Sequence, residues 1–514
     1  MSRMIAVTAA LSPAAIITIP LMVCFFALMV GVGIACRKHA TNVDGFVLGG
    51  RAVGPWLTAF AFGTSYFSAV IFVGYAGQFG WNFGLASTWI GLGNAFIGSF
   101  LAWVVLGSRT RRVTQELGSK TMPDFFEKRY HSPALKIAAS VIVFVFLIPY
   151  TASLYNGLSS LFNNVFQIPY WAGVLMMAVL TGIYVIFGGY MATAINDFIQ
   201  GIIMLMGIVA VVWSVLNQNG GLVQAVDALK HSPYGGEAYT SVLGTDPISL
   251  IFVVLLTSLG TWGLPQMVGK FYSIKDDAAI KKGTIISTVF AVIVAGGCYF
   301  LGGFGRLYGD VVLKNGASVP AFDTIIPTML STLPPLIIAL VVVLVLSASM
   351  STLSSLVLTS SSTLTLDVIV SPMQKKREVS EKRRVFIMRV FIVFFIAISS
   401  VIALLKDSLW KDSVFIAQMM GVSWGALAGA FLAPFLYGLY WKRTSKTAVA
   451  VSFIFGVTME LIQLAIGIGL FTPTDPILSF VFKNSLYSGV FAMVGGLVLL
   501  PIVSLLSPKT VPEE

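Results

Sequence analysis

Hydroxyl side chains gather at unusual density in one long apolar stretch near residues 335–366. It contains the run Ser347-Ala348-Ser349-Met350-Ser351-Thr352-Leu353-Ser354-Ser355. Helical offsets of three and four put Ser351, Ser354 and Ser355 on one face. Hard cations prefer oxygen ligands, and hydroxyls supply them without a full charge. The run therefore predicts a site for a cation such as Na⁺, whereas the later hydroxyls at 359–363 are expected to bond to carbonyls of their own helix.

Two other apolar stretches contain residues that interrupt helices. The first includes Gly63-Thr64-Ser65-Tyr66-Phe67-Ser68, and the second includes Gly260-Thr261-Trp262-Gly263-Leu264-Pro265. Glycine weakens a helix interior, and proline removes a backbone donor. In lipid such a break is tolerated where the freed backbone groups meet protein, water or a ligand. Close helix packing by small residues is the alternative explanation.

Charged residues are rare inside the apolar stretches. Asp197 lies at the predicted inner end of one stretch and Glu460 lies within another. Acidic groups inside a membrane are functional candidates, although Asp197 could also cap a helix. Cys24, Cys36 and Cys298 have no disulfide or metal spacing, and the histidines fall in predicted loops, so a metal centre or a nucleophilic triad is not expected.

These residues belong to a chain that can face water over little of its surface. It has 514 residues, of which 57% are hydrophobic and 10% charged, with a mean hydropathy of +0.90. We predict an all-α integral membrane protein, because runs of about 18 or more apolar residues form membrane helices. The thirteen predicted spans are 14–36, 53–77, 84–107, 135–162, 170–187, 195–216, 248–270, 283–305, 335–366, 385–405, 413–437, 446–470 and 484–506.

Basic residues predict the orientation of these spans. With the N-terminus outside and the C-terminus inside, 25 of the 32 Lys and Arg residues fall on the inner side. This asymmetry follows the positive-inside rule. The net charge of +11 is therefore attributed to topology and phospholipid contact, and no nucleic-acid partner is expected. The absence of a GxxxxGKT motif argues against ATP-driven transport.

The two predicted breaks lie five spans apart. Transporters built from inverted repeats place broken helices at matching positions in both halves, with the binding site between them. We therefore expect one transport domain over 1–514. It would consist of an extra helix at 14–36, a first repeat at 53–216, a second repeat at 248–437 and two C-terminal helices at 446–506.

At these residues the chain resembles the sodium:solute symporter family, over roughly residues 44–445. The resemblance rests on the order and spacing of several short motifs. They are Phe46-Val47-Leu48-Gly49-Gly50-Arg51 with Gly54-Pro55-Trp56, Pro123-Asp124-Phe125-Phe126 with Arg129-Tyr130, Gly188-Gly189 followed by Asp197 and Gln200, and Met350-Ser351-Thr352-Leu353-Ser354.

The resemblance implies the LeuT-type fold of five plus five inverted helices, coupling to Na⁺, and three groups of site residues. The main sodium site would use carbonyls of Thr64, Phe67 and Ala348 with the hydroxyls of Ser351 and Thr352. A second sodium site, found in some members, would use Asp197, Ser354 and Ser355. The solute would lie near Tyr66, Ser68, Ala69, Tyr150, Thr257, Thr261, Trp262 and Pro265.

The sodium/proline members of the family are most similar, but the predicted pocket departs from theirs. They carry an aspartate where this chain has Tyr66, and a tryptophan and a tyrosine where it has Thr257 and Thr261. The function predicted from the sequence is sodium-coupled import of a small organic solute across the cell (inner) membrane. An amino acid such as proline is favoured, ahead of an organic acid (a monocarboxylate, pantothenate or sialic acid) and a sugar.

Three further alternatives remain open at this point. A proton-coupled carrier would use Asp197 or Glu460 as a relay. A membrane sensor would share the fold without transport. An enzyme is the least favoured, because no nucleophile–base pair appears within the spans. The oligomeric state is not predicted.

Overall fold

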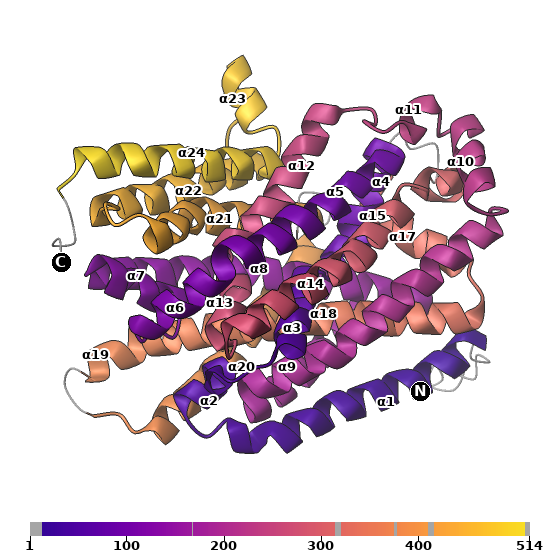
Figure 1. Cartoon of the computed structure of the whole chain (residues 1–514). Coiled ribbons are helices and arrows are strands. Elements are labelled where there is room, and N and C mark those ends of the chain that lie inside the picture. Colours follow the sequence, from indigo (N-terminus) through magenta and orange to yellow (C-terminus); the bar gives the residue numbers. More distant parts are fainter. Residues whose placement is uncertain (1–12, 167, 314–319, 375–377, 410–415, 509–514) are drawn as a thin grey trace.

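The computed structural model describes residues 13–166, 168–313, 320–374, 378–409 and 416–508 (Figure 1). Within these ranges the chain is helical apart from its connections and one isolated β-bridge, between Val53 and Ile274. This agrees with the predicted all-α class. The bridge joins the segment before one broken helix to the segment after the other.

The first half of the chain forms these helices: α1 (Pro13–Ala35), η1 (Cys36–His39), α2 (Val43–Leu48), η2 (Gly49–Arg51), α3 (Pro55–Tyr66), η3 (Val70–Tyr75), α4 (Ala76–Phe83), η4 (Gly84–Ser87), α5 (Thr88–Gly93), η5 (Asn94–Leu101), η6 (Trp103–Gly107), α6 (Ser108–Glu116), α7 (Met122–Tyr130), α8 (Pro133–Phe166), α9 (Tyr170–Gln218), α10 (Leu222–His231) and α11 (Glu237–Thr240).

The second half forms these: α12 (Pro247–Leu259), η7 (Gly260–Gly263), α13 (Pro265–Ser273), α14 (Asp277–Ala291), η8 (Val292–Gly296), α15 (Gly297–Gly302), η9 (Gly305–Tyr308), α16 (Gly309–Val312), α17 (Phe322–Ser331), α18 (Pro335–Thr363), η11 (Leu364–Val370), α19 (Ser371–Gln374), α20 (Glu381–Leu409), α21 (Ile416–Tyr440), α22 (Lys446–Gly467), α23 (Pro476–Val481) and α24 (Ser485–Leu506).

Ten of the described helical segments are long and apolar enough to cross a membrane, or eleven with the bent pair Pro247–Gly263 and Pro265–Ser273. Two of the ten extend over more than one predicted span. Val70–Glu116 covers part of the predicted 53–77 and all of 84–107, and Tyr170–Gln218 covers 170–187 and 195–216. The number of thirteen spans and the orientation of the termini remain predictions.

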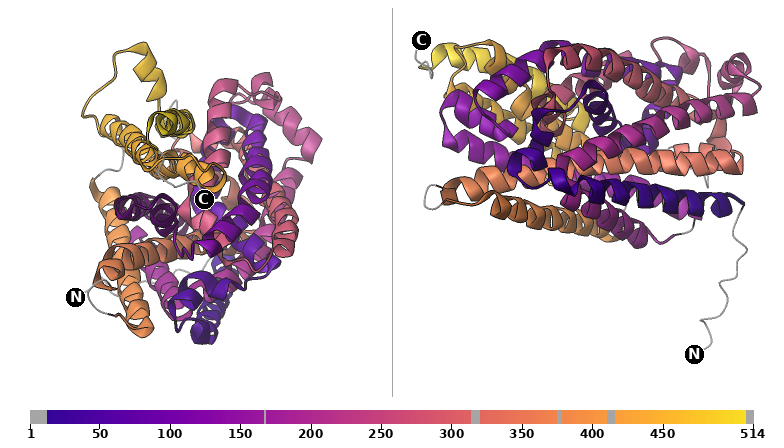
Figure 2. Two further views of the ribbon diagram at one scale, coloured as in Figure 1. Left: turned by 60° about the vertical axis from the view of Figure 1, so that its left-hand side comes forward. Right: turned by 60° about the horizontal axis from the view of Figure 1, so that its bottom comes forward.

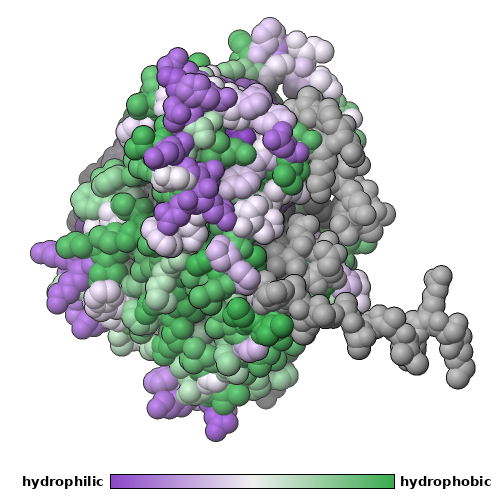
Figure 3. Space-filling view, turned by 90° about the vertical axis from the view of Figure 1, so that its right-hand side faces the viewer, coloured by the Kyte–Doolittle hydropathy of each residue, from purple (hydrophilic) through white to green (hydrophobic). Residues whose placement is uncertain are grey.

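Apolar side chains cover the outside of the bundle as well as its core. Ile285, Ile454 and Trp213 are each at least 65% exposed. Exposure of this kind is costly in water and expected against lipid. Figure 3 looks onto the end of the bundle where α10 and α11 lie, and there hydrophilic residues gather in the upper half while hydrophobic residues cover much of the lower half.

The central helix of the bundle is α18, which is buried along nearly all of its length from Val341 onwards. It packs against α1, α3, α8, α9 and α20. Helices α21, α22 and α24 pack on one another and lie together at one edge in Figures 1 and 2. Because α18 is surrounded by these helices, its serine side chains are buried inside the protein and do not face lipid.

Both predicted breaks are present. The first falls at the end of the predicted stretch: α3 stays helical through Ser65 and Tyr66 and is interrupted at Phe67 and Ser68. Phe67 has extended backbone angles (φ −87°, ψ 115°). In the second, α12 passes through η7 into α13 with a bend of 47°, and Leu264 is extended just before Pro265.

The connection predicted between the spans 170–187 and 195–216 is a kink within one continuous helix, α9. Within α9, Gly189 adopts φ 55° and ψ −147°, which is left-handed backbone that favours glycine. A Cβ at this position would lie 2.8 Å from the carbonyl oxygen of Phe46. Gly189 thus provides both the kink and the close approach of α2 to α9.

Candidate sodium and solute site

The main predicted sodium ligands meet where α3 ends beside α18. The hydroxyls of Ser351 and Thr352 donate to the carbonyl oxygen of Thr64, at 3.2 and 3.3 Å. The same hydroxyls lie 3.2 and 3.1 Å from the carbonyl oxygen of Ala348. All four residues are fully buried. Four of the five predicted ligand oxygens therefore converge on one point between the two helices.

This donor set fits a sodium ion. A hydroxyl rotates freely and can turn a lone pair toward a cation instead of donating to a carbonyl. Carbonyls near a helix break are less committed to the helix ladder, and the fifth predicted ligand, Phe67, lies at the break itself. The arrangement can bind a monovalent cation with neutral oxygens.

The second predicted sodium site contains a residue that was not expected there. The ammonium of Lys270, on α13, donates to Ser355 Oγ at 2.9 Å and lies 3.6 Å from Asp197 Oδ2. Ser354, the third predicted ligand, donates to the carbonyl of Ser351 at 2.9 Å. Lys270 is the last residue of the predicted span 248–270, so it was counted among the basic residues of the inner side and not among the ion ligands.

The predicted solute residues Tyr66 and Tyr150 lie around a tryptophan that was missed. The rings of Tyr66 and Tyr150 lie 5.8 and 6.0 Å from that of Trp424, on α21. Among the described residues, neither the Tyr150 hydroxyl nor the Trp424 Nε1 has a hydrogen-bond partner. Trp424 lies within the predicted span 413–437, where its type and its neighbours do not distinguish it from a lipid-facing or packing residue.

Three other predicted solute residues are engaged in helix contacts. Thr257 donates to Asn94 Oδ1, Thr261 to the carbonyl of Gly98, and Trp262 to that of Ile97, at 3.0 to 3.2 Å. These bonds hold α12 and η7 against η5. The Tyr66 hydroxyl donates to the carbonyl of Thr257 at 2.8 Å, which links the two broken helices directly.

The two remaining small residues sit at the first break. The hydroxyl of Ser68 accepts from the backbone nitrogen of Ile71 at 3.4 Å, as a cap for the helix that restarts there. Ala69 is fully buried and lies against the backbone of α8 at Gly157.

A cavity opens beside α13 and α18, at the end predicted to face the cytoplasm. It spans about 510 Å³, including the part open to solvent. Of the predicted solute residues, Pro265 lines it, together with Gln266, Lys270, Ser355 and Thr359. Both amide atoms of the buried Gln266 lack a hydrogen-bond partner among the described residues. Gln266 is thus an unpaired polar side chain on the cavity wall that was not among the predicted solute residues.

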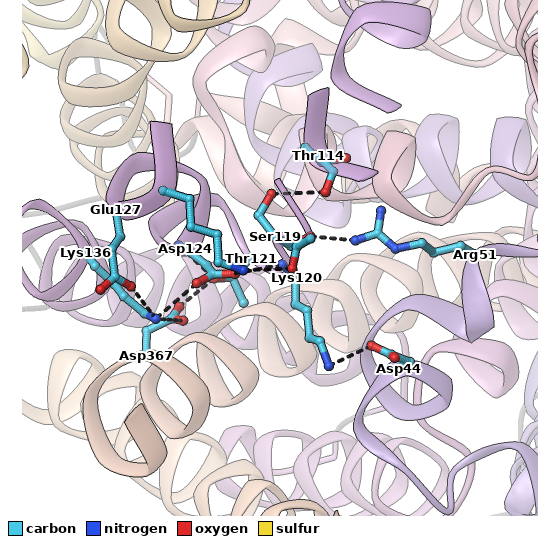
Figure 4. A network of polar contacts seen from close by, with 12 residues as sticks. Asp44, Arg51, Thr114, Ser119, Lys120, Thr121, Asp124, Glu127, Lys136 and Asp367 are labelled. Carbon is cyan, nitrogen blue, oxygen red and sulfur yellow. Dashed lines mark hydrogen bonds and ion pairs between the residues drawn. The ribbon is translucent and has the colours of Figure 1, made fainter. Parts of the chain in front are cut away.

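A network of ion pairs lies at the same end (Figure 4). Lys136 is its centre, with Nζ 2.7 Å from Glu127, 3.0 Å from Asp124 and 3.6 Å from Asp367. Asp367 also accepts from Thr121 at 2.6 Å. These contacts join α7, α8 and η11, and Thr121 also lines the cavity.

The network continues toward the first broken helix. Lys120 pairs with Asp44 at 2.9 Å, and Arg51 donates to the carbonyls of Ser119 and Tyr272. Burial raises the pKa of the Asp124 carboxyl, but the ammonium groups of Lys136 and Lys128 outweigh burial and hold its pKa below the usual range. Asp124 is therefore ionised at neutral pH.

Glu460 lies apart from this network. It is fully buried on α22, accepts from Ser488 at 2.9 Å, and leaves its other oxygen without a hydrogen-bond partner among the described residues. Its carboxylate faces Gly425 on α21, and Glu460 is not among the residues that line the cavity.

Comparison with known proteins identifies the family of the chain. Residues 46–456 match the sequence profile of the Sodium:solute symporter family. The chain belongs to this family. The symporters are multi-pass membrane proteins that couple transport to Na⁺, so the predicted class, localisation and coupling ion are confirmed.

Several named relatives are similar to this symporter over most of its length. It is 29% identical over 452 residues to Sodium/proline symporter 2 of Staphylococcus saprophyticus, covering 86% of this chain and 85% of the relative. It is 29% identical over 451 residues to the osmoregulated proline transporter OpuE of Bacillus subtilis, covering 86% and 88%. These relatives are transporters, not enzymes.

The fold also matches a solved structure. The substrate-bound, outward-open Na⁺-coupled sialic acid symporter superposes with a TM-score of 0.77 at 16% identity, covering 96% of this chain and 98% of that one. The two chains therefore share the LeuT-type fold of sodium symporters.

Proposed function

We propose that this symporter imports a small organic solute by alternating access, driven by a sodium ion bound between α3 and α18. The convergence of the Ser351 and Thr352 hydroxyls on the carbonyls of Thr64 and Ala348 supports this proposal most directly. The main site would be completed by the carbonyl of Phe67.

Sodium at this site would tie the end of α3 to α18. Tying two elements with one ion lowers the cost of forming the solute pocket, and such coupling is typically worth about 1–3 kcal/mol and is reciprocal. The membrane potential adds about 2.3 kcal/mol per charge per 100 mV. Release would follow where the cavity beside α13 opens to the low-sodium side.

The repeat assignment is part of the proposal. Residues 53–216 and 248–437 would form two inverted repeats, with α1 before them and α22 and α24 after them. The broken helices α3–η3 and α12–η7–α13 would then occupy equivalent places. The link from Tyr66 to Thr257 crosses directly between them.

An amino acid such as proline is the proposed solute. The named relatives transport proline according to their names, and Tyr66, Ser68, Ala69, Tyr150 and Trp424 provide an aromatic and small-residue surface for a compact molecule. The cavity wall carries the buried amide of Gln266, whose two polar atoms lack a partner among the described residues, and such an amide would hydrogen-bond a solute carboxylate. An organic acid is therefore the second candidate.

A thermal-shift screen of amino acids and organic acids, with Na⁺ or choline, would identify the solute. Counterflow of the labelled solute in proteoliposomes would then test transport. We expect uptake with sodium and none when choline replaces it at fixed pH. Uptake that persists in choline and follows the pH gradient would favour a proton-coupled carrier using Asp197 or Glu460, and binding without counterflow would favour a sensor.

A further inference from the structure

Lys270 is the buried cation closest to the predicted second sodium site. Its side chain is 4% exposed, and that of Asp197 is fully buried. Its Nζ donates to Ser355 Oγ at 2.9 Å, lies 3.6 Å from Asp197 Oδ2, and faces the ring of Tyr190 at 5.5 Å. Two of the three predicted sodium ligands are therefore in contact with an ammonium group.

An ammonium group and a sodium ion are stabilised by the same kind of ligands. Both are monovalent cations stabilised by carboxylate and hydroxyl oxygens, and the ammonium supplies three hydrogen-bond donors to them. When both groups are ionised, the charges of Asp197 and Lys270 cancel. A sodium ion added beside Asp197 and Ser355 would leave a net positive charge in a buried site, where like charges repel strongly.

We propose that Lys270 is a built-in cation that takes the place of a second sodium ion, so that this symporter binds one sodium ion per chain. The inference rests on the proposed function, because it concerns the second of the two predicted ion sites. It assigns to Lys270 a role in setting the ion stoichiometry, which no feature of the sequence had indicated.

The position of Lys270 also gives the cation a mechanical role. Lys270 belongs to α13, Asp197 to α9 and Ser355 to α18, and Ser355 Oγ is 2.7 Å from Ser65 Oγ on α3. Both broken helices are thus joined to α18 through one hydroxyl. A sodium ion would join these helices only while it is bound, whereas Lys270 joins α13 to α18 without a bound ion.

The two ion positions lie on adjacent turns of α18. Ser354 donates to the carbonyl of Ser351 at 2.9 Å, one turn from the main site. The main site contains no charged side chain, so sodium there is not displaced by Lys270. The structure therefore separates an exchangeable cation at Ser351 and Thr352 from a covalently attached one at Asp197 and Ser355.

Equilibrium binding of radioactive sodium to the purified, full-length protein, with choline keeping the ionic strength constant, tests the inference. We expect one sodium ion per chain in the wild type, two in Lys270→Met, and one in Lys270→Met combined with Asp197→Asn. Lys275→Met is the matched control, because Lys275 is half exposed on the following loop. It should bind one ion.

Two ions in the wild type, or a single ion in Lys270→Met, would overturn the inference. The wild-type count decides the matter even if Lys270→Met fails to fold. Loss of all binding in Ser351→Ala with Thr352→Ala would show that the single ion is at the main site. A wild type that binds no sodium would instead contradict the proposed main site, and would overturn the inferred count with it.

Discussion

The hydroxyl of Ser351 on α18 donates to the carbonyl oxygen of Thr64 on α3 across 3.2 Å. These residues are 287 positions apart in the chain and come from the two proposed repeats. Thr352 reaches the same carbonyl from the next position of α18. A cation inserted between these oxygens would replace hydrogen bonds that already join the two helices, so its binding changes how strongly they are held together.

The break at Gly263 should tolerate no side chain. A Cβ there would lie 2.9 Å from the Cα of Ala428 and from the backbone nitrogen of Leu432 on α21. Overpacking of this kind costs about 1–3 kcal/mol. Gly263→Ala should therefore lower the thermal midpoint in detergent and reduce counterflow. Gly269→Ala is the control, because its Cβ would meet nothing within 4 Å, and equal effects of the two substitutions would contradict the account.

Trp424 should contribute to solute binding but not to sodium binding. Its indole nitrogen is buried beside Tyr66 and Tyr150 without a hydrogen-bond partner in the described structure. Losing one hydrogen bond to a solute costs about 1 kcal/mol, or roughly five- to tenfold in affinity. We expect Trp424→Phe to weaken solute binding by this factor, measured by thermal shift, with sodium binding unchanged.

The control for that substitution is Trp103→Phe. Trp103 is an equally buried indole with an unpartnered nitrogen in the described structure, but it packs against Phe62 and Phe271 instead of the predicted pocket. Solute affinity should not change in this variant. If both substitutions had the same effect, the assignment of Trp424 to the pocket would be wrong.

Lys136 should be the most important charge for stability at the predicted inner end. Its side chain is 9% exposed and faces three carboxylates. Removing one partner of a buried ion pair costs about 3–5 kcal/mol. Lys136→Met should lower the thermal midpoint strongly. Lys120→Met, which removes a 33% exposed partner of Asp44, should cost about 1 kcal/mol or less, and the reverse order of effects would contradict this reading.

Local sequence patterns predicted much of the fold, because the length of an apolar run and the positions of glycine and proline determine where a membrane helix forms and where it breaks. Glycine and proline marked the broken helix at Gly263 and Pro265, where both the missing donor and the small side chain are needed. The first break fell at Phe67 and Ser68, at the end of the predicted stretch from Gly63 to Ser68, since tertiary contacts decide where a helix without proline unwinds. The gap between the predicted spans 170–187 and 195–216 marked the kink at Gly189, but the close approach of Phe46 is a tertiary contact that no local pattern contains.

At the ion sites, too, local sequence patterns predicted some residues, whereas others are recruited by tertiary packing. The spacing of Ser351, Ser354 and Ser355 on one helix predicted a polar face, and the structure brings Ser351 and Thr352 against Thr64. Lys270 and Trp424 were missed because each reaches its site from a different helix. Their roles depend on packing among α13, α21 and the rest of the bundle, which a single sequence does not reveal.

Sodium-dependent counterflow of the identified solute in Ser351→Ala and Thr352→Ala tests the central claim most directly. Ser349→Ala is the matched control, because the Ser349 hydroxyl bonds to the carbonyl of Val345 in its own helix. We predict that half-maximal uptake requires at least tenfold more sodium in the two site variants and the wild-type concentration in the control. Unchanged sodium dependence in both site variants would contradict a sodium site between α3 and α18.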